Sequence, residues 1–111
     1  MGKKEKGLYG LYKKEKEYDH KDTLEKLKAL GDETRLRIIE LIIEKPLSAS
    51  ELSLLLNLTI PTIAHHLKIL VAGELISTYI ENEGVSKVTY KIFNVGFDEL
   101  IKNLNVLNQE V

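Results

Sequence analysis

Apolar residues recur at three- and four-residue intervals through much of the chain, which is the spacing that places side chains on one face of an α-helix. Two helices are predicted in the first half. The first runs from Asp22, as its N-cap, to Leu30, and Gly31 stops it. The second covers residues 33–44 and ends before Pro46, because the residue preceding a proline is disfavoured in helical torsions.

A short helix followed closely by a longer one is predicted in the middle of the chain. Ser48 and Glu51 have the spacing of a capping box, in which a hydroxyl and a carboxylate satisfy the first backbone N–H groups of a helix. This third helix extends to about Leu56. After a brief turn, a fourth helix covers residues 59–72, with Thr59 as its N-cap.

The spacing of apolar residues changes after the fourth helix. Residues 75–80 and 85–92 are rich in Ile, Val, Thr and Tyr, and residues 82–84 between them are Asn-Glu-Gly, which indicates a β-hairpin. Helical spacing returns over residues 97–111. The predicted fold class is α+β and mostly α: a helix-turn-helix followed by a two-stranded wing at residues 76–92, with additional helices at both ends.

Length and charge give the expected organisation. The 111 residues are enough for one domain, and the formal net charge is −1. Residues 1–21 alternate Lys and Glu around a Gly-Leu-Tyr repeat and are expected to be a charged tail or arm, whereas residues 22–111 form the domain. No apolar run approaches the ~20 residues of a membrane span. We therefore expect a cytoplasmic protein without a membrane partner.

The composition also excludes several kinds of site. Without cysteine the chain has no disulfide, thiolate metal site or cysteine nucleophile. No paired acid and base, phosphate-binding glycine loop or nucleophile motif emerges from the spacing. The sequence therefore predicts a protein that is not an enzyme, with no cofactor and no metal site.

The outward face of the fourth helix carries the candidate chemistry. No Asp or Glu lies between Thr59 and Ala72, although the chain as a whole is acidic. A helix that enters the major groove needs polar side chains without a charge that phosphate repels. The side chains expected to point outward or to flank that face are Thr59, Thr62, His65, His66 and Lys68. An ordinary packed helix with solvated histidines is the alternative.

Several motifs in this order resemble the ArsR-type winged-helix repressors. The first is LKALGDETRLRII at residues 27–39. SEL at residues 50–52 and LTIPTIAHHLKIL at residues 58–70 are similar to the helix-turn-helix of that family. GELI at residues 73–76 and VTY at residues 88–90 resemble parts of its wing.

This resemblance implies a homodimeric transcriptional regulator, usually a repressor, that binds double-stranded DNA at a palindromic operator. It places the fourth helix in the major groove, and the wing, including Lys87, near the backbone or minor groove. Residues expected to bind DNA are Thr59, Thr62, His65, His66, Lys68 and Lys87. The alternative function is a winged-helix module that binds protein, with DNA binding lost or secondary.

The chain departs from the family pattern in three ways. Metal-sensing members have a cysteine motif at the start of the third helix, where this chain has LSAS at residues 47–50. The wing carries Glu81 and Glu83, where basic residues are common, and Lys87 and Lys91 partly offset them. The fourth helix has no Arg for bidentate reading of guanine.

The two terminal helices carry apolar side chains that a small core cannot cover. In the resembled family these helices pair across a two-fold axis, which implies a homodimer; the alternative is that the last helix folds back within one subunit. The residues expected at the dimer interface are Leu24, Leu27, Phe97, Leu100, Ile101, Leu104 and Leu107.

Overall fold

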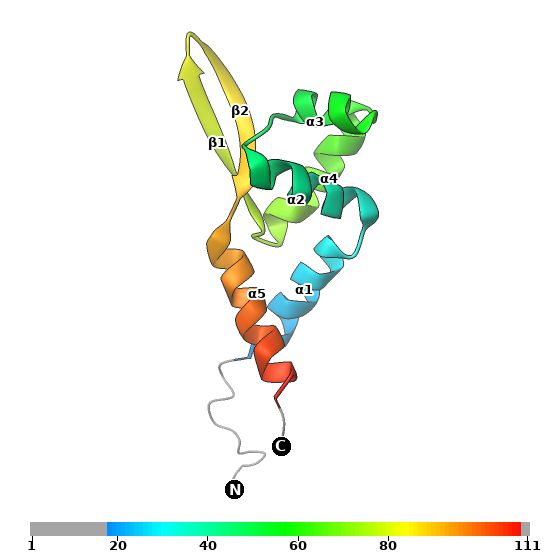
Figure 1. The fold of residues 1–111 in the computed structure, drawn as a ribbon, viewed down its shortest axis with the longest axis vertical. Helices are drawn as coiled ribbons and strands as arrows, with labels where there is room; N and C mark the ends of the chain where they lie inside the picture. Colours follow the sequence, from blue (N-terminus) through cyan, green and yellow to red (C-terminus); the bar gives the residue numbers. More distant parts are fainter. Residues whose placement is uncertain (1–17, 110–111) are drawn as a thin grey trace, which may run out of the picture.

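The computed structural model describes residues 18–109, so most of the predicted N-terminal tail and Val111 lie outside the described residues. Within these residues, five helices and one hairpin follow one another in the predicted order (Figure 1), which confirms the mostly helical α+β winged fold. The elements are α1 (His20–Leu30), α2 (Glu33–Glu44), α3 (Ala49–Leu56), α4 (Ile60–Ala72), β1 (Ile76–Glu83), β2 (Val85–Ile92) and α5 (Asn94–Leu107).

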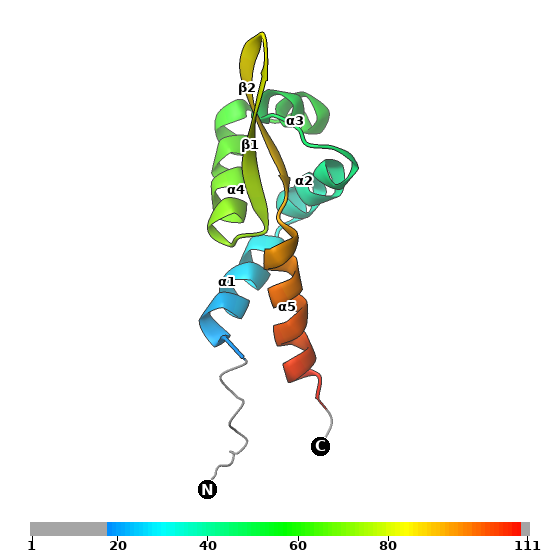
Figure 2. The same ribbon diagram turned by 90° about the vertical axis from the view of Figure 1, so that its left-hand side faces the viewer.

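The hydrophobic core lies among α2, α3, α4 and the base of the hairpin. Ile38, Leu52, Ile63 and Leu70 are fully buried there, one or two from each of the three helices. Leu47, in the connection between α2 and α3, exchanges two backbone hydrogen bonds with Tyr90 of β2, at 2.8 and 3.2 Å. This short bridge attaches the hairpin to the helices, and the tip of the hairpin extends beyond them (Figure 2).

The hairpin is longer and its turn tighter than the sequence indicated. The strands are antiparallel, with the register running from Ile76 opposite Ile92 to Glu83 opposite Val85. β1 therefore continues to Glu83 through residues that we expected in the loop. Gly84 makes the turn at φ +87°, a torsion that glycine adopts without steric cost.

Two helix starts differ from the prediction. Asp19, not Asp22, is the N-cap of α1, because its carboxylate accepts the backbone N–H of Asp22 at 3.0 Å. The helix therefore begins at His20 and includes Asp22 in its first turn, where the helix dipole favours an acidic side chain. α5 begins at Asn94 instead of Phe97, because β2 passes into it with almost no loop, and its last helical residue is Leu107.

α1 and α5 lie side by side and extend away from the core on the side opposite the tip of the hairpin (Figures 1 and 2). Most of the residues that they bury are polar or small, and only one of them is a leucine. α1 buries Thr23, Lys26 and Ala29, and α5 buries Gly96, Leu100 and Asn103.

Candidate nucleic-acid interface

The turn between α3 and α4 sets the geometry of the site. The chain changes direction by 115° between the two helices, within the range of a helix-turn-helix. Asn57 makes this possible by adopting the left-handed conformation at φ 57° as the C-cap of α3. Thr59 then caps α4, since its hydroxyl accepts the backbone N–H of Thr62 at 3.3 Å. Both helix starts that the sequence predicted here, including the Ser48–Glu51 capping box, are confirmed.

α4 presents a polar outward face. Ile63, Leu67 and Leu70 are buried against the core, so the opposite side of α4 faces outward. The exposed polar residues are Thr59, Thr62, His65 and Lys68. The Thr59 hydroxyl also donates to the Thr62 hydroxyl at 2.9 Å, which holds these two side chains together at the start of the helix.

His66 does not share this outward face. Its side chain is only 15% exposed, because it lies beside the buried stripe of α4 and faces the junction of α1 and α2. Its Nδ1 atom is 3.0 Å from an Arg35 guanidinium nitrogen and 3.8 Å from an Asp32 carboxylate oxygen. Of the two expected positions, outward or flanking, His66 therefore has the flanking one, and its side chain is directed toward the α1–α2 junction.

Arg35 links three helices through one guanidinium group. Its Nε donates to the carbonyl of Ala29 at 2.7 Å, and one terminal nitrogen is 3.4 Å from the carbonyl of Lys28, both in the last turn of α1. Those carbonyls lie at the negative end of the helix dipole, where a cation is favourable. Arg35 belongs to α2, and its contact with His66 adds α4 to the cluster.

The pKa values in this cluster follow from its geometry. Partial burial lowers the pKa of His66 below its ordinary value of 6.5; Arg35 and the neighbouring His65 lower it further, while Asp32 opposes them. The backbone N–H of Arg35 is the main cause that lowers the pKa of Asp32, whose carboxylate caps α2 at 3.1 Å. The neutral imidazole and the ionised carboxylate are thus the favoured forms.

The sequence-based predictions gave Arg35 no role of its own, because they placed it only in the helix at residues 33–44 and in the motif at residues 27–39. A signal was available. A basic side chain in the first turn of a helix lies at the unfavourable end of the dipole. Arg35 therefore needed acceptors from elsewhere, and the free carbonyls at the end of α1 were only a few residues away.

The wing is held to α3 by an ion pair. Lys87 of β2 donates to the Glu51 carboxylate at 2.9 Å, and the other oxygen of Glu51 completes the capping box with the backbone N–H of Ser48 at 2.8 Å. The Ser48 N–H and Lys87 lower the pKa of Glu51, and the same contact raises the pKa of Lys87. Lys87 is half-exposed and also lies opposite Glu81 in the sheet. Its charge is thus already largely compensated within the subunit.

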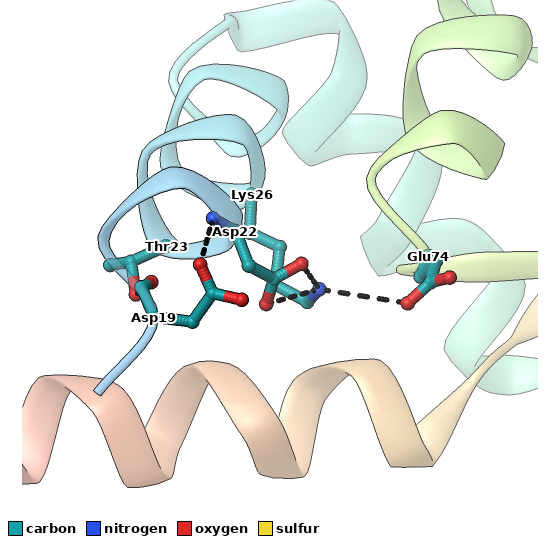
Figure 3. Close-up of polar contacts among 5 residues, drawn as sticks. All are labelled: Asp19, Asp22, Thr23, Lys26 and Glu74. Carbon is teal, nitrogen blue, oxygen red and sulfur yellow. Dashed lines mark hydrogen bonds and ion pairs between the residues drawn. The ribbon is translucent and has the colours of Figure 1, made fainter. Parts of the chain in front are cut away.

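A polar cluster lies between α1 and the end of α4 (Figure 3). Lys26 is 1% exposed, and its Nζ donates to both carboxylate oxygens of Asp22 at 2.7 and 2.8 Å. Glu74 is 4.0 Å away on its other side. On α5, both amide atoms of buried Asn103 lack a hydrogen-bond partner among residues 18–109, which is costly. The contact between α1 and α5 within one subunit is therefore partly polar.

The apolar side chains of the terminal helices face outward instead. Leu24 and Leu27 of α1 and Ile101, Leu104 and Leu107 of α5 are exposed to between 37% and 58%. Leu100 is different, since it is buried within the subunit, and Phe97 is half-buried against the core. The expectation that Leu100 lies on the exposed stripe is therefore wrong, because α5 turns the side of Gly96 and Leu100 toward its own subunit.

The described residues form neither a metal-binding cluster nor a single membrane-spanning helix. Within residues 18–109 there is no group of three or more His, Asp or Glu side chains placed to hold a metal ion. Among the same residues, no single helix is long and apolar enough to span a membrane. The bent pair α3–α4 meets that test by length and composition alone, and both helices contribute to the core.

Known proteins are similar to this chain in sequence and in fold. Residues 32–78 match the model of the family described as "Bacterial regulatory protein, arsR family". The arsenical resistance operon repressor of Staphylococcus aureus is 37% identical over 82 residues, which are 74% of this chain and 76% of that protein. The corresponding repressor of Staphylococcus xylosus is 33% identical over the same shares.

Among solved structures, an ArsR-like transcriptional regulator from Rhodococcus sp. RHA1 matches with a TM-score of 0.70 and 25% identity, over 80% of this chain and 81% of that one. A homodimeric winged helix-turn-helix DNA-binding domain from Mycobacterium bovis matches with a TM-score of 0.59 over 78% and 79% of the two chains. Its 19% identity supports the fold alone.

Proposed function

Because the chain belongs to the ArsR family of DNA-binding transcriptional regulators, which are not enzymes, we propose that it is a sequence-specific, homodimeric repressor acting in the cytoplasm. α4 enters the major groove of a palindromic operator, and the wing lies along the neighbouring backbone or minor groove. The repressor assignment rests on the names of the staphylococcal relatives.

The observation that carries this proposal is the outward face of α4. Its exposed polar side chains are hydroxyls, an imidazole and one ammonium group, with no carboxylate. In this proposal Thr62 and His65 hydrogen-bond to base edges, and Lys68 neutralises a phosphate. Lys87 has a smaller role in this proposal than the sequence suggested, because Glu51 already holds it. His66 is not included among the residues that read bases.

The exposed leucines of α1 and α5 support the homodimer. Five large apolar side chains on the outer sides of two adjacent helices form a surface that a second copy can cover. With one Lys on each α4, a single subunit makes few phosphate contacts, and joining two half-sites adds their binding energies. The two copies of α4 are then ~34 Å apart, one turn of DNA.

In this proposal, any ligand that regulates the repressor differs from an arsenical bound through cysteine thiolates. The names of the relatives point to arsenical resistance, but this chain has no cysteine to supply soft thiolate ligands. We propose regulation by a small molecule, a partner protein or abundance of the repressor.

Binding to DNA is tested by selecting duplexes from a random pool and measuring affinity for the selected sequence. Thr62→Val and His65→Ala should each weaken specific binding by ~1–3 kcal/mol and leave the helical content unchanged. Lys68→Ala should weaken all duplexes about equally and reduce the salt slope by roughly one. Lys21→Ala, an exposed lysine at the far end of α1, is the matched control and should bind like wild type.

The result that contradicts the assignment is a chain that selects no duplex, or one whose three α4 variants all bind like wild type. Failure to select any duplex would favour the protein-binding alternative. The dimer is tested separately by light scattering. Full-length protein should be dimeric at tens of micromolar, Leu104→Glu should dissociate it, and Glu99→Lys on the same helix should not.

A further inference from the structure

The cluster of His66, Arg35 and Asp32 lies between the two surfaces that the proposed function uses, the dimer surface and the DNA-binding surface. α1 carries part of the proposed dimer surface, and α4 carries the DNA-reading face. Arg35 contacts the last turn of α1 through two carbonyls and α4 through His66. Gly31 and Asp32 form the short connection between α1 and α2 at the same place.

We propose that His66 is a positioning residue for DNA binding: it accepts a hydrogen bond from Arg35 and so fixes α4 in orientation relative to α1. This inference rests on the proposed function, since it concerns how the reading helices of a dimer are aligned. It assigns to His66 a role different from the base contact that the sequence suggested.

The chemistry of the two side chains defines the tautomer. A guanidinium group has only donors, so the Nδ1 atom 3.0 Å from it has to be the acceptor. The proton of the neutral imidazole is therefore on Nε2. Arg35 is in turn held by the Ala29 carbonyl at 2.7 Å, so the connection from α4 to α1 runs through one rigid, planar group.

Protonation of His66 breaks this connection. A proton on Nδ1 removes the acceptor and places a positive charge against Arg35. The charged and titratable groups facing His66 are Arg35 on α2, Asp32 in the connection before it, and His65 on α4 itself. From α1 the carbonyls of Lys28 and Ala29 hold the guanidinium. Only Asp32 favours the charged imidazole; its Oδ2 is 3.8 Å from Nδ1, beyond hydrogen-bond distance, and accepts the backbone N–H of Arg35.

The alignment matters because a dimer binds two half-sites at once. A helix-turn-helix dimer needs its two reading helices at a fixed separation and angle. If α4 can rotate on α1, each subunit still folds and still pairs, but fewer dimers have both helices in the orientation that fits. Affinity then falls in proportion to that fraction.

The test uses two full-length variants of His66. His66→Asn places Oδ1 where Nδ1 was, so it keeps an acceptor for Arg35 but cannot be protonated. His66→Leu fills similar space without an acceptor. For the duplex that the wild-type chain selects, His66→Asn should bind within about threefold of wild type at about pH 8. His66→Leu should bind at least about tenfold more weakly, the loss expected for a hydrogen bond to a charged group.

The pH profile separates positioning from simple core packing. As the pH is lowered from about 8 toward 5, wild type should lose affinity for the duplex and His66→Asn should lose less of it, because only wild type protonates at this position. The direct contribution of His65 is common to both proteins and cancels in the comparison. His20→Asn, an exposed histidine at the first residue of α1, is the control and should follow the wild-type profile.

Two results would overturn the inference while the proposed function stands: equal affinity of His66→Leu and wild type for the selected duplex, or the same pH profile in wild type and His66→Asn. A nitrogen NMR spectrum showing the proton on Nδ1 at about pH 8 would also overturn it. If the wild-type chain selects no duplex, the proposed function fails and the positioning role fails with it. For each variant, light scattering measures the oligomeric state and circular dichroism measures the helical content. A His66→Leu protein that is dimeric and folded but binds the duplex weakly supports the proposal.

Discussion

Gly96 offers the sharpest test of how α5 is attached to the rest of the domain. This residue lies in the first turn of α5 and is buried against the left-handed residue Glu74, which follows α4. A Cβ atom added to Gly96 would lie 1.6 Å from the Glu74 carbonyl oxygen and 2.7 Å from its carbonyl carbon. We therefore expect Gly96→Ala to be strongly destabilising.

The magnitude follows from the displacement that the new atom requires. Real Cβ contacts are essentially never under 3.0 Å, so the oxygen has to move by at least about 1.4 Å, the difference between 3.0 and 1.6 Å. The neighbour is backbone and cannot rotate away. Overpacking of this kind costs up to about 3 kcal/mol, and the better helix propensity of Ala returns about 1 kcal/mol, which leaves a net loss of about 2 kcal/mol.

Thermal unfolding measures this loss. For a domain of this size each kcal/mol lowers Tm by about 4–8 °C, so Gly96→Ala should lower Tm by about 8–16 °C at equal protein concentration. Gly73→Ala is the matched control, because a Cβ there would meet Ala29 at 3.5 Å, an ordinary contact. Equal Tm values for the two variants would refute the claim that α5 approaches Glu74 this closely.

Three further predictions concern single contacts. Asn103→Leu should raise the free energy of unfolding by about 1–2 kcal/mol in urea titrations, because it removes two buried amide atoms that have no partner in the described part of the chain; a loss of stability would contradict this. Asn57→Ala should lower that free energy by about 1 kcal/mol, whereas Asn57→Gly should change it by only a few tenths, since φ 57° suits glycine; two equal losses would show that the torsion is not the cause. Asp32 has a pKa below its ordinary 3.8, so its contribution to stability is present above that pH and disappears as the pH falls below it. Asp32→Asn should therefore show a shallower loss of thermal stability below about pH 4 than wild type, and identical slopes would argue against an ionised cap.

The sequence by itself determined the local structure. Capping boxes, proline and glycine act over a few residues, so the limits of α2, α3 and α4 and the presence of the hairpin could be predicted from them. The outward face of α4, which has no acidic side chain, could also be predicted from the sequence, because the spacing of Ile63, Leu67 and Leu70 defines the buried side. The order of these motifs also sufficed to indicate the family.

Only the tertiary structure decided the direction of side chains that lie at the margin of the buried side of a helix. Helical spacing does not say whether His66 faces DNA or the α1–α2 junction, since that depends on which helix packs beside it. Likewise the leucine spacing of α5 treated Leu100 and Leu104 alike, but Gly96 lets one side of the helix approach Glu74, which buries Leu100 and leaves Leu104 outside. Contacts such as Lys87 with Glu51 join residues far apart in the chain, and no local pattern encodes them. The sequence thus determines helices and caps through short-range sterics and hydrogen bonds, whereas the assignment of each face to core, partner or DNA requires the packing of the whole domain.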